Sequence, residues 1–469
     1  MLLKFFRLFY FAFIFLLCFS SPAYAYLDPG TTSLLLSSAV AVLASVLYFL
    51  KTLFYKLARG GFSSFFAPEL PNKQNAIVIY SEGKQYFGVF KPIVDAFEKH
   101  HYPYTYYTSD ENDPILQFKS NIAHIECIGQ NNRAYARLNT LSADIVLMTT
   151  PQLDILQIKK SKGVKHYCHI LHSPGLVDSY EIFALDCFDS VFTNSIIHTD
   201  FIREVEHIRH LKTKQIEMVG LTYMDYLNEK LNHLNHLKNQ KSTVNAKFFP
   251  KNNNNNKTIL IAPSWGRNAL FAKYGMKLLK PLCETKHNII IRAHPQSYIS
   301  QADLIAHLQQ ETQPYSNCVW DKQTDNIDAL SESDCIIGDF SGVLWDYLLL
   351  FNKPILVVHF EFNLIGYDLE DTSRQKAWSD IELPKVSHFL EEKDFENIEQ
   401  VIENAFNDKQ KEESRNKMKE LLWQHPGKSG ENTFKALLKI RQNLLKESLG
   451  EKMHTYEEIC ALENLIQQG

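Results

Sequence analysis

The sequence predicts an α/β protein with two doubly wound domains, each built on a parallel sheet, behind a signal peptide and one transmembrane helix. Three observations predict this organisation. Two apolar segments lie within the first 59 residues. From residue 76, short β-branched runs alternate with amphipathic helical stretches, which is typical of parallel sheets covered by helices on both faces. The asparagine-rich stretch 251–257 interrupts this alternation, which then restarts, so the chain divides into two halves.

The N-terminal residues 1–25 have the pattern of a secretory signal peptide. Lys4 and Arg7 precede the apolar run Leu8–Phe19, and a small-x-small sequence ends at Ala25. An ordinary buried helix is the alternative interpretation of this run.

The next apolar segment predicts a transmembrane helix at residues 33–54. Leu34–Leu50 carries no charge and reaches the short end of the ~17–25 residues that cross a bilayer. The preceding loop carries only Asp28, whereas the basic residues that follow the segment are Lys51, Lys56 and Arg59. The positive-inside bias therefore predicts a protein of the inner membrane with everything after residue 59 on the cytoplasmic side. The protein is single-pass if the signal peptide is cleaved, and the two segments form a hairpin if it is retained. A buried core helix is the alternative.

The first half, residues 76–245, contains five strand-like runs and two amphipathic helices. The strand-like runs are Ala76–Tyr80, Tyr102–Tyr107, Ala143–Met148, Ser190–Thr193 and Gln215–Val219. The helical stretches are Phe87–His100 and Ile196–Arg209.

The second half, residues 258–440, repeats the pattern and is followed by a charged helical tail, residues 441–469. The strand-like runs are Thr258–Ala262, Asn288–Arg292, Asp334–Gly338 and Pro354–Val358. Helical spacing occurs at Met276–Thr285, Gly342–Phe351, Asn397–Phe406 and Thr433–Leu445, the last two of which we expect to pack back across the domains. In open α/β sheets the ligand lies beyond the carboxyl ends of the strands, so the strand-to-loop junctions are the candidate sites.

The composition excludes several classes of protein. Of 469 residues, 45% are hydrophobic and 22% are charged, which is ordinary for a globular protein and not for a disordered or collagen-like chain. The net charge of -4 lacks the basic excess of a nucleic-acid-binding protein, so we expect no nucleic-acid partner. The eight cysteines form no C-x-x-C pair, which predicts a reduced compartment and neither a zinc ribbon nor a disulfide framework.

Two junctions in the second half carry candidate anion-binding groups. His294 follows the apolar strand at 288–292, where an imidazole can donate a hydrogen bond to a phosphate oxygen, and Arg292 precedes it. In the stretch 338–347, Ser341, Gly342 and the backbone N–H groups of a helix start can hold an anion, with Asp339 and Asp346 beside them. The alternatives are a histidine that closes a turn and two plain helix N-caps.

Two further junctions complete the set. His172 lies at the end of a strand in the first half, before Pro174 and Gly175, where it can serve as a general base, whereas His169 packs under the sheet. After the first strand of the second half, Ser264 and Arg267 can contact phosphate, although a structural turn is equally compatible.

These four stretches resemble the CDP-glycerol glycerophosphotransferase family, over roughly residues 76–440. The family's elements are an APTW stretch, a histidine-glycine turn, an R-x-H-P turn and a D-Y-S-S-x-x-x-D-Y/F stretch followed by K-P-I. The corresponding stretches here are APSW at 262–265, HSPG at 172–175, RAHP at 292–295 and DFSGVLWDY at 339–347, with KPI at 353–355. This sequence departs from the family at Gly342, which replaces the second serine, and at Ser173-Pro174, which interrupts the histidine-glycine step.

The resemblance implies a GT-B architecture and a membrane-associated transferase, although the predicted signal peptide and anchor depart from the family's peripheral membrane-binding segments. It implies that the C-terminal half holds the CDP end of the donor, that His172 and His294 flank the reacting phosphate, and that Ser341 with the Gly342 amide binds the diphosphate. The expected reaction moves a glycerophosphate or similar polyol-phosphate unit from a CDP-alcohol to a hydroxyl of a lipid-linked cell-surface polymer precursor and releases CMP. No D-x-D cluster follows a strand, so we expect no metal and no cofactor beyond the donor substrate, with Asp339 and Asp346 as the exceptions to consider.

Two alternatives remain open from the sequence. The first is a GT-B glycosyltransferase that uses a CMP- or UDP-sugar, because the same cleft would serve a sugar donor. The second is a non-catalytic, membrane-anchored partner in polysaccharide assembly.

Overall fold

The computed structural model describes residues 76–240, 246–250, 256–323, 326–358, 360 and 365–468. The predicted signal peptide (1–25) and transmembrane helix (33–54) lie outside the described residues. Within the described ranges, none of the helices combines the length and the apolar character that a membrane span needs.

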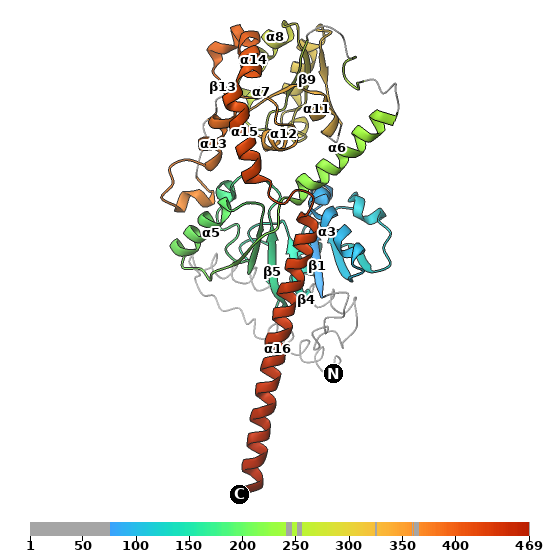
Figure 1. The fold of residues 1–469 in the computed structure, drawn as a ribbon, viewed down its shortest axis with the longest axis vertical. Coiled ribbons are helices and arrows are strands. Elements are labelled where there is room, and N and C mark those ends of the chain that lie inside the picture. The colour runs from blue at the N-terminus through green and yellow to red at the C-terminus, as the bar shows by residue number, and fades with distance from the viewer. Residues whose placement is uncertain are drawn as a thin grey trace, which may run out of the picture. The chain divides into compact units, whose positions relative to one another are not determined.

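The first domain is a parallel sheet of seven strands in the order β3-β2-β1-β4-β5-β6-β7 (Figure 1). The strands are β1 (Ile77–Ser81), β2 (Tyr104–Thr108), β3 (Ala123–Cys127), β4 (Ser142–Met148), β5 (Gly163–Ile170), β6 (Ser190–Thr193) and β7 (Gln215–Met218). The helices are η3 (Lys84–Tyr86), α3 (Phe87–Lys99), η4 (Pro114–Gln117), α4 (Asn132–Leu138), η5 (Val177–Ser179), α5 (Ile197–Ile208) and α6 (Thr222–Gln240). The chain builds outward from β1 on one side and then crosses to β4 on the other, so a topological switch point lies between β1 and β4.

The second domain is a parallel sheet of six strands in the order β10-β9-β8-β11-β12-β13. Its strands are β8 (Thr258–Ile261), β9 (Asn288–Ile291), β10 (Cys318–Trp320), β11 (Cys335–Gly338), β12 (Ile355–Val358) and β13 (His388–Leu390). Its helices are α7 (Leu270–Lys273), α8 (Met276–Cys283), α9 (Ser297–Ser300), α10 (Ala302–Thr312), α11 (Ile327–Glu332), α12 (Val343–Phe351), η6 (Asp368–Asp371), α13 (Trp378–Val386), η7 (Glu392–Asn397), α14 (Ile398–Asn407) and α15 (Lys409–Leu422). The prediction of two parallel-sheet α/β domains is confirmed.

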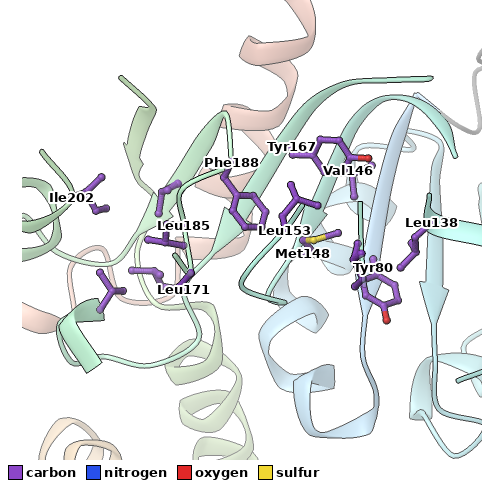
Figure 2. Packing of buried hydrophobic residues seen from close by; sticks show 14 of the residues in the cluster. Tyr80, Leu138, Val146, Met148, Leu153, Tyr167, Leu171, Leu185, Phe188 and Ile202 are labelled. Atoms are coloured by element: carbon purple, nitrogen blue, oxygen red, sulfur yellow. The ribbon is translucent and has the colours of Figure 1, made fainter. Parts of the chain in front are cut away.

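The core of the first domain shows why these segments form strands. Every residue of β1 is buried, because helices cover both faces of the sheet. On one face, Tyr80 of β1, Val146 and Met148 of β4 and Tyr167 of β5 join a single apolar cluster (Figure 2). Burial of such side chains stabilises the fold by about 1.5–3 kcal/mol each.

The last helix, α16 (Ser429–Gln468), includes both the predicted helix at 433–445 and the charged tail. Although it follows the second sheet in the chain, it packs against α3 and β4 of the first domain. Phe434 and Leu437 are buried in the same cluster as Phe97 of α3, and Arg441 forms an ion pair with Asp144 of β4. The C-terminal helix therefore ties the chain back to the first sheet.

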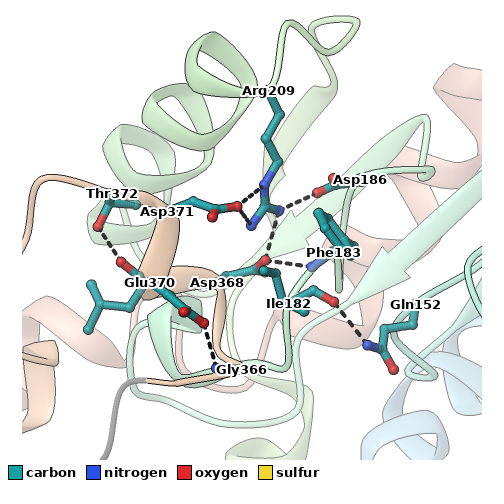
Figure 3. A network of polar contacts seen from close by, with 11 residues as sticks. Gln152, Ile182, Phe183, Asp186, Arg209, Gly366, Asp368, Glu370, Asp371 and Thr372 are labelled. Carbon is teal, nitrogen blue, oxygen red and sulfur yellow. Dashed lines mark hydrogen bonds and ion pairs between the residues drawn. The ribbon is translucent and has the colours of Figure 1, made fainter.

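A second connection between the halves is the segment 365–378, which follows β12 and which we call the bridging segment. Leu369 and Ala377 of this segment are buried in the core cluster of the first domain. Figure 3 shows Arg209, at the end of α5, in ion pairs with Asp186, Asp368 and Asp371. The bridging segment is therefore fixed on the first domain by both apolar and charged contacts.

Candidate active site

The candidate residues of the second domain lie in loops at the carboxyl end of the sheet. Strands β9, β8 and β11 are neighbours and all are parallel, so the loops that follow them meet beyond their carboxyl ends. These loops carry Arg292 and His294, Ser264 and Arg267, and Asp339 to Gly342.

Asp339 connects two of these loops. Its side chain is buried, and its two carboxylate oxygens accept hydrogen bonds from the backbone N–H groups of Ser264 and Leu270, each at 2.8 Å. Burial raises the pKa of this carboxyl, while the backbone hydrogen bonds oppose the shift. Since both oxygens are engaged by the loop after β8, Asp339 positions Ser264 within that loop.

The two arginines of the predicted site have different surroundings. Arg292 forms an ion pair with buried Asp321, so its charge is balanced within the protein. Arg267 is exposed beside Trp265, whose side chain is 46% exposed. Of these two cations, Arg267 is therefore the one that is open to an anionic ligand.

His294 has a defined proton position. The backbone N–H of Gln296 donates to His294 Nδ1 at 3.1 Å, so the neutral ring carries its proton on Nε2. Burial lowers the pKa of His294, which keeps the ring neutral near pH 7. The Trp265 ring lies beside it, with 6.2 Å between ring centroids. His294 therefore presents Nε2–H as a hydrogen-bond donor.

The start of α12 is open. Gly342 is its N-cap, no side chain caps the helix, and a Cβ added at Gly342 would meet no atom within 4 Å. Ser341 is half-buried next to it. The first N–H groups of a helix carry a partial positive charge and are suited to an anion. Asp346, one turn further on, has its pKa raised to about 7 by loss of solvent.

His172 of the first domain lies in an aromatic cluster that the sequence did not predict. Its ring is perpendicular to Tyr86 and stacked on Tyr180, with centroid distances of 5.3 and 6.1 Å. Its Nδ1 is buried with no hydrogen-bond partner in the described part of the chain, and burial lowers its pKa to about 4. Tyr86 and Tyr180 are two of 22 tyrosines, and no local pattern distinguishes them. His169 is fully buried beneath the sheet, as predicted.

The turn that begins at His172 lies against α12. A Cβ added at Gly175 would be 4.0 Å from Trp345 Nε1 of α12 and 3.7 Å from Trp378 Cζ3 of α13. Asn194 also donates to the Pro174 carbonyl and to the Leu422 carbonyl of α15. The structure thus brings the predicted HSPG turn to the helix that begins at Gly342, while no contact among the described residues joins His172 to His294 directly.

The described residues contain one group with metal-ligand spacing, and it lies away from the candidate active site. His287, Glu399 and Glu403 offer ligand atoms within 4.8 Å of one another, but His287 precedes β9 and is therefore at the amino end of the strands. Lys286 already pairs with both carboxylates. This group is not part of the candidate active site.

Comparisons with solved structures show a shared fold. The wall teichoic acid polymerase TagF is 17% identical, with a TM-score of 0.53 over 87% of this chain and 99% of that one. A TagF variant with one histidine changed to asparagine, soaked with CDPG, gives 16% identity and a TM-score of 0.51 over the same shares. The UDP-GlcNAc 2-epimerase of Methanocaldococcus jannaschii, in complex with UDP-GlcNAc and UDP, is 13% identical. Its TM-score is 0.50 over 77% of this chain and 99% of that one. At these identities the likeness concerns the fold alone, and it is consistent with a GT-B-like arrangement.

Comparison with protein families goes further than the fold. The family described as CDP-glycerol:poly(glycerophosphate) glycerophosphotransferase matches residues 190–428, about half of the chain. That range contains Ser264, His294 and Ser341 but not His172. No curated protein sequence matches the chain. This chain belongs to the CDP-glycerol glycerophosphotransferase family and is a transferase.

Proposed function

We propose that this protein transfers a glycerophosphate or similar polyol-phosphate unit from a CDP-alcohol to a hydroxyl of a lipid-linked precursor of a cell-surface polymer, with release of CMP. The observation that carries the proposal is the contact of the HSPG turn with α12, within a chain whose family match spans the second domain. That contact joins the loop of a potential base to the helix whose open start suits a diphosphate.

The donor side of the proposal rests on groups that stabilise negative charge. His294 Nε2–H, the Ser341 hydroxyl and the N–H groups at the start of α12 act on the phosphoryl oxygens, and exposed Arg267 adds a positive charge. Such fixed donors cost little reorganisation as charge develops in the transition state. Asp339 contributes indirectly, because it holds the Ser264 loop.

The acceptor side assigns the base to His172. The acceptor oxygen attacks the β-phosphorus, the bond from that phosphorus to the bridging oxygen breaks, CMP leaves with the bonding electron pair, and the hydroxyl proton passes to the imidazole. With a pKa of about 4, the free ring is neutral and able to accept a proton. A bound diphosphate would raise the pKa of His172 from this low value toward ~7, because nearby negative charge favours the imidazolium.

The N-terminal segments complete the proposal. A transmembrane helix at 33–54 would hold the transferase at the inner membrane, with its two domains on the cytoplasmic side, where a lipid-linked acceptor and a soluble nucleotide donor can meet.

The test uses the full chain in detergent or vesicles. It is incubated with CDP-glycerol, CDP-ribitol, a CMP-sugar and a UDP-sugar, each with a lipid-linked acceptor, and nucleotide release and product mass are measured. We expect CMP release and a mass increase of one polyol-phosphate unit with a CDP-alcohol. Nucleotide release only from a sugar donor would favour the glycosyltransferase, and turnover of none of the donors would overturn the proposal.

The matched variants are His172→Ala, His294→Ala and His307→Ala. His307 is exposed on α10 and is not one of the candidate site residues, so its variant serves as the control. The proposal requires that the first two lose at least about 100-fold in kcat and that the third retains activity. Full activity of His172→Ala would remove the assigned base.

A further inference from the structure

The first domain contains a cavity that the proposed reaction does not yet use. It has a volume of ≈ 390 Å³ and is lined by residues that follow β1, β2, β3 and β4. The carboxyl ends of these strands surround the topological switch point between β1 and β4, which is where open α/β sheets place ligands. The volume is within the ~300–1,000 Å³ of small-molecule sites.

The lining combines apolar and polar side chains and carries no positive charge. Among the described residues around the cavity there is no Lys, Arg or His, and Glu82 is the one carboxylate. The remaining polar groups are hydroxyls and carboxamides, including those of Ser109, Asn131 and Gln157. Such a surface opposes phosphate groups and suits a neutral ligand that both donates and accepts hydrogen bonds.

One hydroxyl in the lining is already desolvated and lacks a partner. Thr150 Oγ1 is buried with no hydrogen-bond partner among the described residues. A buried, unpaired hydroxyl costs about 1–3 kcal/mol, which a ligand hydroxyl would recover. By contrast, the Tyr80 hydroxyl is satisfied by Ser109 at 3.0 Å.

Two of the lining residues hold strained backbone. Asn131 and Gln152 have φ values of 50° and 56°, in the left-handed region that non-glycine residues seldom adopt. Gln152 is fixed there by hydrogen bonds to the Ile182 and Ala184 carbonyls (Figure 3 shows the first). Backbone strain that the surroundings enforce is characteristic of ligand sites.

The cavity is connected to His172. Thr150 and His172 each lie two residues beyond the ends of the paired strands β4 and β5. Burial first, and then the nearby Glu82 carboxylate in the lining, raises the pKa of Tyr86 to about 12. The Tyr86 ring in turn contacts His172.

We propose that this cavity binds a neutral sugar portion of the acceptor and delivers its hydroxyl to His172. The proposal rests on the proposed function for the role of His172, and it specifies the substrate: the part of the acceptor that enters the first domain is a glycan and not a chain of polyol phosphates. The volume admits a sugar, and the absence of cations among the described lining residues disfavours a polyanion.

The test measures binding of cellobiose, N,N′-diacetylchitobiose, glycerol 1-phosphate and CDP to the full chain by ligand-observed NMR. We expect at least one disaccharide to bind and CDP not to compete with it. Thr150→Val should weaken disaccharide binding by about fivefold, the value of one hydrogen bond, while the free energy of unfolding stays equal or rises because the unpaired hydroxyl is gone.

A second variant combines Gln130→Ala, Asn131→Gly and Gln157→Ala. These side chains are exposed and have no hydrogen-bond partner in the described ranges, and glycine tolerates the positive φ of residue 131. We expect at least about tenfold weaker disaccharide binding, whereas Asn132→Ala, on the neighbouring exposed position of α4, should bind like the wild type.

The outcomes separate this inference from the proposed function. Binding of no disaccharide, unchanged binding by both cavity variants, or tighter binding of glycerol 1-phosphate than of a sugar would overturn the inference even if CMP is released from a CDP-alcohol. Conversely, absence of CMP release would overturn the transferase reaction while disaccharide binding still reported on the cavity.

Discussion

The Asp339 carboxylate accepts a hydrogen bond from the Ser264 backbone N–H at 2.8 Å, and this contact joins the loops after β11 and β8. The second oxygen holds Leu270 at the start of α7 in the same way. Asp339 was predicted to bind the donor. Its contacts instead hold the loop that carries Ser264 and Arg267.

Replacement of Asp339 by asparagine should lower both stability and donor affinity. The amide would direct an N–H toward one of two backbone donors, which leaves a buried group unpaired at a cost of about 1–3 kcal/mol. Chemical unfolding and CDP titration measure the two effects. Asp334→Asn is the matched control, since Asp334 accepts from the Thr258 N–H at the amino end of the same sheet. Equal losses of CDP affinity in both variants would contradict a local role for Asp339.

The His294 ring should be a donor in the free protein. Because the Gln296 N–H occupies Nδ1, nitrogen-15 NMR should find the Nε2–H tautomer at pH 7. His294→Gln should lower kcat by about 10²–10³, the usual loss for one oxyanion donor, with a smaller effect on KM. His287→Gln, at the amino end of the same strand β9, should leave kcat unchanged. An Nδ1–H tautomer would exclude the donor role.

The activity should depend on pH through His172 in a defined direction. Burial depresses its pKa to about 4, so the free protein loses its base only when the pH falls through about 4. Bound donor raises that pKa, so the acid limb of kcat should lie above the acid limb of kcat/KM. A pH–rate series from 3.5 to 8 measures both limbs. If the kcat limb lies at or below the kcat/KM limb, the diphosphate is not next to His172.

Most central strands were predictable, although no range was predicted for the central strand β5, and of the four edge strands only β7 was predicted. The runs IVIY at β1 and NIII at β9 are buried on both faces, so their apolar character identifies them without any partner. The edge strands β3, β10 and β13 were missed, because β3 (Ala123–Cys127) alternates apolar and polar residues and the other two have three residues each. Short, half-exposed edge strands gain their pairing from the sheet and not from local sequence.

The strand ends that carry the candidate residues were predictable, but the partners of those residues were not. The strand-end rule located His172, His294 and Ser341 from the sequence, since each follows an apolar run. It did not predict that Asp339 accepts a hydrogen bond from Ser264 or that Arg292 forms an ion pair with Asp321. Each of these pairs joins residues far apart in the chain. The tyrosines around His172 and the cavity lining were missed for the same reason: they come from different strands and loops.

Arg209 should contribute more to stability than any exposed ion pair, because it is only 9% exposed and pairs with three carboxylates of two segments. Burial raises the pKa of Asp368 to about 6 even with Arg209 beside it, so removal of the guanidinium leaves a carboxylate with little compensation. We expect Arg209→Ala to lose about 3–5 kcal/mol of unfolding free energy. Lys417→Ala, which breaks an exposed pair with Glu413, should lose at most about 1 kcal/mol. Denaturant unfolding at pH 7.5 measures both losses of unfolding free energy. At pH 5 Asp368 is mostly protonated and no longer needs a charged partner, so the loss in Arg209→Ala should be smaller than at pH 7.5. A loss that stays constant or grows toward pH 5 would show that the contribution of Arg209 does not depend on the charge of Asp368.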